Sequence, residues 1–178
     1  KVSAIYDKGK GALAIVQTTT LAAAGTPLFD TEWQIFYRGE GGFGGERGPE
    51  TAAVEIPARE PDFREEQQTL DTQSLLYRLS GDINPIHASP DLAKMAGFPR
   101  PILHGLCTFG FVGRAVVRHA CDGDPARLRA LETRFAKIVF PGDTLVTEGW
   151  RSGARASLRV TTKDRGESVL SHAFAEVG

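Results

Sequence analysis

The sequence predicts an α+β protein in which one long central helix is wrapped by an antiparallel sheet. The run 103–119 has the length of a helix, and its first full charge is Arg114, so we expect it to be buried. It is too short to cross a membrane, which takes about 20 apolar residues. Strand-like segments lie before and after it, at 2–38, 63–70 and 131–177, and turn pairs such as Ser152-Gly153 and Arg165-Gly166 interrupt the last of them.

The composition limits the possible partners. A chain of 178 residues suits one medium domain, or one domain and part of another. A net charge of −1 gives no reason to expect nucleic acid or an anionic membrane as a partner. No targeting or transmembrane segment is visible. Cys107 and Cys121 lack the spacing of metal ligands, so we expect reduced thiols in a cytosol-like compartment and no metal.

The stretch 77–89 carries the strongest candidate site. It places a carboxylate, Asp82, and an imidazole, His87, on one short loop. Gly81 and Pro85 on either side of Asn84 resist regular structure, and a loop held by a proline can direct two side chains to one point. A carboxylate and an imidazole that share a water molecule can perform general acid–base catalysis.

The start of the long helix offers a second half of the site. Gly105 lies where backbone N–H groups are unpaired and the helix dipole is positive. A glycine there allows close approach, so its amide can bind a carbonyl oxygen that gains charge. His104, next to it, is expected to be a buried hydrogen-bonding residue and not a catalytic one.

These two stretches, together with 39–47, Arg134 to Lys137 and Pro141-Gly142, resemble a known family over almost the whole chain. The resemblance is to the (R)-specific enoyl-CoA hydratases, the hydratase 2 branch of the MaoC-like hot-dog enzymes. It is closest to the hydratase units of the multifunctional enzymes of peroxisomal β-oxidation. It implies the hot-dog fold, an acyl-CoA thioester as substrate, and no cofactor, since CoA is part of the substrate.

The resemblance also implies roles for individual residues. Asp82 and His87 hold the reacting water, with His87 as the base and Asp82 as the acid, and Asn84 orients the site. The thioester oxygen binds the amide of Gly105. Further substrate contacts are expected from the glycine-rich segment 39–48 and near the active loop. These contacts are Phe43, Gly44, Arg100 and Lys137.

Residues 1–48 are expected to be the C-terminal strands of a first, non-catalytic hot-dog repeat. Trp33, Ile35 and Tyr37 alternate with polar residues, the period of a half-buried strand. We expect three strands in 2–38 and no helix, so that something outside this segment must cover its apolar face. In hydratase 2 proteins with two repeats, the front half of the first repeat precedes such a segment, and we expect it to precede Lys1. The partner arrangement is then a homodimer or a pseudo-dimer of hot-dog repeats.

Residues 49–61 are expected to be a linker and residues 62–178 a complete catalytic hot-dog domain. Asp71 and Thr72 can cap a short helix over 74–79, and Ser89 can start another over 90–96. Four strands should follow the long helix, at 131–139, 144–150, 155–162 and 168–177.

The sequence therefore predicts an enzyme that hydrates trans-2-enoyl-CoA to (R)-3-hydroxyacyl-CoA, cytoplasmic in a bacterium or peroxisomal in a eukaryote. Two alternatives stay open. A non-catalytic acyl-CoA-binding subunit on the same fold would be expected to lose Asp82 or His87, yet both are present. A hot-dog thioesterase would need a nucleophile or a differently placed acid.

Overall fold

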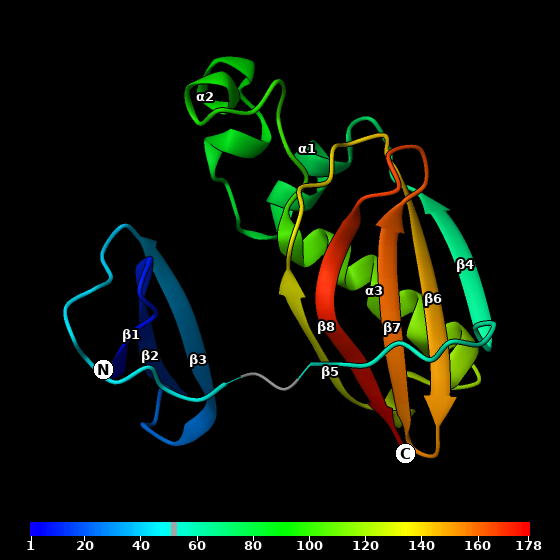
Figure 1. Ribbon diagram of the computed structural model, residues 1–178, viewed down its shortest axis with the longest axis horizontal. Helices are drawn as coiled ribbons and strands as arrows, with labels where there is room; N and C mark the ends of the chain where they lie inside the picture. Colours follow the sequence, from blue (N-terminus) through cyan, green and yellow to red (C-terminus); the bar gives the residue numbers. More distant parts are fainter. Residues whose placement is uncertain (51–52) are drawn as a thin grey trace. The chain divides into compact units, whose positions relative to one another are not determined.

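The computed structural model describes residues 1–50 and 53–178 and divides the chain into two compact units, Lys1–Thr51 and Ala52–Gly178. Thr51 and Ala52, inside the expected linker 49–61, lie outside the described residues. Figure 1 follows the chain through its strands and helices. Among the described residues, no helix is long and apolar enough to cross a membrane.

The first unit is a three-stranded antiparallel sheet in the order β1-β2-β3 (Figure 1). Its strands are β1 (Val2–Asp7), β2 (Gly11–Leu21) and β3 (Pro27–Arg38). The turn between β1 and β2 contains Gly9, and the turn between β2 and β3 contains Gly25, both at positive φ, where glycine is favoured. The prediction of three strands and no helix in 2–38 is confirmed.

The expectation that the third strand is half-buried is wrong. Trp33 pairs with Val16 and Ile35 with Ala14 across β2 and β3, which places an apolar stripe on one face of the sheet. Trp33 is nevertheless 56% exposed and Tyr37 50% exposed. The physical reason is that residues 1–50, the described part of the first unit, form no helix that could lie on this face.

The second unit is a five-stranded antiparallel sheet in the order β4-β6-β7-β8-β5, with helix α3 (Gly105–Ala120) across one face (Figure 1). The buried side chains of α3, such as Val112 and Val116, pack against strand residues such as Leu145 and Val160 in one apolar core. The strands are β4 (Phe63–Gln68), β5 (Leu128–Phe135), β6 (Thr144–Ser152), β7 (Arg155–Thr162) and β8 (Ser168–Val177).

Three details of the second unit differ from the sequence prediction. The helix is not buried all round, because Leu106 is 61% exposed on the side turned away from the sheet. Strand β5 begins and ends earlier than expected, so Lys137 follows the strand instead of lying in it. Thr72 stands at the start of α1 (Gln73–Tyr77), but its side chain makes no capping hydrogen bond.

Short helices between β4 and α3 shape the candidate site. After α1 come the 3₁₀ turns Arg78–Ser80 and Pro85–His87, and then α2 (Pro90–Met95). The hydroxyl of Ser89 accepts a hydrogen bond from the amide of Leu92, as predicted for the start of this helix. A further 3₁₀ turn, Pro125–Arg127, connects α3 to β5.

Candidate active site

The loop that carries Asp82 and His87 is held in shape by its own side chains. Gly81 ends a 3₁₀ turn at φ 116°, a conformation that favours glycine. A carboxylate oxygen of Asp82 accepts a hydrogen bond from the amide of Asn84 at 3.2 Å. The side-chain oxygen of Asn84 in turn accepts from the amide of Ile86 at 3.2 Å and caps the next turn. Asn84 therefore acts on the backbone of the loop.

His87 is buried, and its hydrogen bond fixes the state of the ring. Nδ1 lies 2.8 Å from the carbonyl oxygen of Ile102, which can only accept, so Nδ1 carries the hydrogen. In the neutral ring, Nε2 then keeps its lone pair. This is the form of an imidazole that can take a proton from water.

Asp82, His87 and His104 form a compact polar cluster. A carboxylate oxygen of Asp82 and one ring nitrogen of each histidine lie within 4.8 Å of one another. Groups this close can be bridged by one water that makes hydrogen bonds of about 2.8 Å to each of them. The expected meeting of Asp82 and His87 at one point is compatible with this geometry.

The same cluster does not fit a metal ion well. It is the one group of three ligand-type side chains that the described part of the chain brings together. The rings of His87 and His104 are stacked, with centroids 3.7 Å apart and planes 25° from parallel. Imidazole lone pairs lie in the ring plane, so two stacked rings direct them side by side and not toward one ion.

His104 is enclosed beneath the loop. It is 1% exposed, and its Nε2 lies 3.0 Å from the backbone carbonyl of Asp82. Its ring also lies against that of Tyr77, with centroids 4.8 Å apart. Burial lowers the pKa of His104, which favours the neutral ring, and burial raises the pKa of Tyr77. The buried hydrogen-bonding role expected of His104 is confirmed.

Gly105 is the first residue of α3, and its amide has no acceptor among the described residues. With His87 it lines a cavity of about 190 Å³. A Cβ at Gly105 would lie 3.1 Å from the ring of Phe135, so a larger residue here would press on the cavity wall. The unpaired amide at the positive end of a helix can bind an oxygen that gains negative charge.

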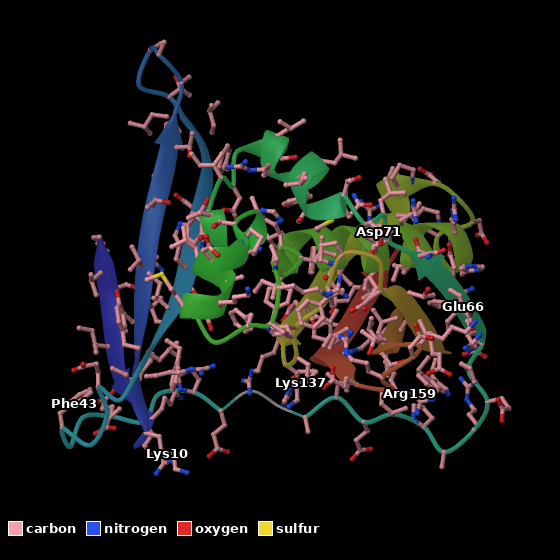
Figure 2. All side chains as sticks on the ribbon, turned by 90° about the horizontal axis from the view of Figure 1, so that it is seen from above. Lys10, Phe43, Glu66, Asp71, Lys137 and Arg159 are labelled. Carbon is pink, nitrogen blue, oxygen red and sulfur yellow. The ribbon has the colours of Figure 1, made fainter. Side chains whose placement is uncertain are left out.

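Lys137 also lines the cavity of about 190 Å³, whereas Arg100 does not. Arg100 donates to the carbonyl of Pro141 at 3.0 Å, and its guanidinium lies over the ring of Phe140. It borders a second hollow of about 150 Å³, which His87 and Asp71 also line. Figure 2 labels Lys137 and Asp71 on the second unit.

Phe43, which Figure 2 labels, and its neighbour Gly44 belong to the first unit. Phe43 is 55% exposed on the glycine-rich loop, and the amide of Gly44 donates to a carboxylate oxygen of Asp7 at 2.8 Å. Their contact with substrate stays a prediction.

Several residues that line the cavity beside Gly105 were not predicted as site residues, Thr108 and Phe135 among them. Thr108 is buried one turn further along α3, and Phe135 comes from the end of β5. The spacing of Thr108 from Gly105 on a helix could have indicated the first. Phe135 lies inside the stretch 134–137 that carries the family resemblance, but no residue pattern there indicates its contact with Gly105, which arises only when the strand packs against the helix.

Residues 52–172 match the family described as MaoC like domain. The chain is 46% identical to the probable enoyl-CoA hydratase 2 of Dictyostelium discoideum, over 98% of this chain and 61% of that protein. It is 42% identical to the peroxisomal enoyl-CoA hydratase 2 of Arabidopsis thaliana, over 96% of this chain and 58% of that protein. The chain thus spans about three fifths of the length of these curated relatives.

A crystal structure of a MaoC-like dehydratase from Phytophthora capsici matches 100% of this chain and 63% of that one, with a TM-score of 0.89 and 38% identity. The full-length peroxisomal multifunctional enzyme type 2 from Drosophila melanogaster matches with a TM-score of 0.85 and 36% identity, over 100% of this chain and 32% of that one. The long helix wrapped by an antiparallel sheet is the hot-dog fold, as the sequence predicted. By this architecture and by its sequence, the chain belongs to the MaoC-like family.

Proposed function

We propose that this chain hydrates trans-2-enoyl-CoA to (R)-3-hydroxyacyl-CoA. The observation that carries the proposal is the cluster of Asp82 and His87 beside the free amide of Gly105. It offers a water site and an oxyanion site within one unit of the fold. The names of the relatives, enoyl-CoA hydratase 2 in an amoeba and in a plant, support the same reaction.

In the proposed mechanism the thioester oxygen binds the N–H of Gly105, which makes C3 of the conjugated system electrophilic. Water between Asp82 and His87 attacks C3, and Nε2 of His87 accepts its proton. The electron pair of the C2–C3 double bond moves toward the thioester oxygen. Asp82 supplies a proton to C2 on the same face, and the proton held by His87 returns to Asp82 before the next turnover. The net change is the addition of one water.

The thioesterase alternative is less well supported. Cys107 lies near this site and is buried, and burial raises the pKa of its thiol to about 11. A thiol of that pKa stays protonated near neutral pH and is a poor nucleophile. Cys107 therefore gives no support for acyl transfer to its thiol.

The substrate contacts, partners and location follow from the same proposal. Lys137 would pair with a CoA phosphate, since it is exposed at the cavity beside Gly105. Arg100, Phe43 and Gly44 would contact substrate, and no cofactor is needed. Residues 1–48 would be the last strands of a first hot-dog repeat, and the assembly would be a homodimer or pseudo-dimer of repeats. The enzyme would be peroxisomal in a eukaryote and cytoplasmic in a bacterium.

The decisive measurement is the ultraviolet absorbance of an enoyl thioester. Hydration removes the conjugation without releasing thiol, whereas hydrolysis releases free CoA. Crotonyl-CoA and decenoyl-CoA test the chain length, and chiral analysis of the product tests the (R) configuration. We expect Asp82→Asn and His87→Ala each to lower kcat by at least about 100-fold, because each removes one proton-transfer group.

His119→Ala is the matched control, because His119 is an exposed histidine that pairs with Glu65. It should keep hydratase activity. Release of thiol in place of hydration, or near-normal hydration by a folded Asp82 or His87 variant, would overturn the proposal.

A further inference from the structure

The ring of His104 contacts both proposed catalytic residues, Asp82 through its backbone and His87 through its ring. Its Nε2 bonds to the backbone carbonyl of Asp82 at 3.0 Å, and its face stacks on His87 with centroids 3.7 Å apart. It is 1% exposed, so water does not compete for these contacts. Because His104 immediately precedes Gly105, one residue connects the main chain of Asp82, the ring of His87 and the first residue of α3.

The tautomer and charge of the His104 ring follow from its hydrogen-bond partners. The carbonyl of Asp82 can only accept, so Nε2 of His104 carries the hydrogen. Nδ1 is buried and has no partner among the described residues. A charged ring would place a second hydrogen there, buried and unbonded, beside the ring of His87. Burial, which lowers the pKa of His104, opposes that state as well.

We propose that His104 is a positioning residue that stays neutral and holds the main chain of Asp82 and the ring plane of His87 in register with the Gly105 amide. This inference rests on the proposed hydration. A ring locked in this way fixes the water site to the oxyanion site, and misplacement of reacting groups by about 1 Å can cost about 100-fold in rate. His104 does not itself touch substrate in this account.

Three substitutions separate the two contacts. His104→Gln keeps a side-chain N–H that can reach the Asp82 carbonyl but loses the stacked ring. His104→Phe keeps a ring against His87 but loses the hydrogen bond, and its volume protects the fold. His104→Ala loses both contacts. We expect the Ala variant to lower kcat by about 10- to 100-fold with KM changed less than about threefold, and the Gln and Phe variants each to recover part of kcat.

Activity of the unmodified enzyme tests the proposed hydration, and the kcat of each variant is compared with that of the unmodified enzyme. Failure of the proposed hydration and failure of the positioning role are therefore distinguishable. Circular dichroism and the Kd for a saturated acyl-CoA give the folded fraction of each variant. A His104→Ala protein with kcat within twofold of the unmodified enzyme would overturn the positioning role. So would a loss of kcat in all three variants that merely follows the folded fraction.

A measurement independent of activity is the ¹⁵N chemical shift of the imidazole nitrogens. We expect His104 to be neutral and protonated on Nε2 at pH 6.5, the ordinary pKa of histidine. A doubly protonated His104 at that pH, or hydrogen on Nδ1, would contradict the inference whether or not the protein hydrates any enoyl-CoA.

Discussion

At the scale of single residues, the site depends on which backbone groups are paired and which are free. The sequence predicted that Asp82, His87 and Gly105 carry the chemistry, since an acid, an imidazole and a helix-start glycine are recognisable types. It could not predict the tautomers. The hydrogen bond of His87 goes to the carbonyl of Ile102, and that of His104 to the carbonyl of Asp82. A backbone carbonyl carries no sequence signal.

The role of the Gly105 amide can be tested by a substitution that removes its hydrogen. Proline is well accepted at the first position of a helix, and His104 already has ψ 136°, which suits the residue before a proline. We expect Gly105→Pro to lower kcat by about 100- to 1,000-fold, the usual cost of one oxyanion donor.

Gly105→Ala is the matched control for that change. Either new residue brings a Cβ to about the same 3.1 Å from Phe135, but alanine keeps the N–H. Steady-state measurement of kcat for hydration by the two variants shows whether the N–H or the added Cβ is responsible for the loss. Equal losses of kcat would mean that crowding against Phe135 is responsible and that the amide plays no part.

At the scale of elements, the glycine-rich loop is more ordered than its composition suggests. One carboxylate oxygen of Asp7 accepts from the amides of Gly9 and Gly42, and the other from Gly44, each at 2.8 Å. These backbone donors, that of Gly42 first, lower the pKa of Asp7, so the carboxylate stays charged. A glycine-rich composition alone suggests a flexible turn, but Asp7, which orders this loop, lies far from it in the sequence.

This arrangement predicts a local effect of Asp7→Asn. An asparagine keeps one acceptor oxygen but presents an NH₂ group where the other oxygen was, so one set of donors loses its acceptor. We expect the amides of the loop, Gly44 above all, to exchange hydrogen at least about tenfold faster.

Asp30→Asn is the control for this measurement, because Asp30 is an exposed carboxylate on β3 of the same unit. Amide exchange followed by NMR compares the two variants. Unchanged protection of Gly42 and Gly44 in Asp7→Asn would show that the loop keeps its shape without the charge.

At the scale of the whole molecule, periodicity and turn residues predicted most elements, including β7 and β8 at their observed bounds. Burial was less predictable. Alternation at Trp33 and Tyr37 marks an apolar face, but only the folded chain shows whether anything covers it. The uncharged run before Arg114 likewise suggested complete burial of α3, whereas a sheet on one side leaves Leu106 exposed. The pairing of distant strands also set the bounds of β5.

Acid should weaken the whole fold through carboxylates such as Asp62. The guanidinium of Arg59, and then the amide of Arg151, lower the pKa of Asp62 from 3.8 to about 2. A carboxyl with a lowered folded-state pKa contributes stability that is fully present above about pH 4 and is lost as pH falls toward 2.

We therefore expect the difference in free energy of unfolding between the unmodified protein and Asp62→Asn to be largest near neutral pH and to shrink between pH 4 and pH 2. Urea unfolding at several pH values measures it. A difference that stays constant down to pH 2 would show that the Arg59–Asp62 pair, which is largely exposed, contributes nothing through its charge.

The order of the strands also has a consequence for how the candidate site folds. Phe63 at the start of β4 pairs with Gly149 on β6. The catalytic loop and all of α3 therefore lie in the long segment of chain between these two paired strands. Closing such a loop costs entropy before its contacts form, which slows folding. Within this segment, the amide of Leu103, which directly precedes His104 and Gly105, donates a 2.7 Å hydrogen bond to the carbonyl of Val139. The catalytic loop and α3 thus lie between the two strands of the second unit that pair over the longest separation in sequence, and we expect a substitution that weakens the pairing of β4 to lower activity without contacting the site.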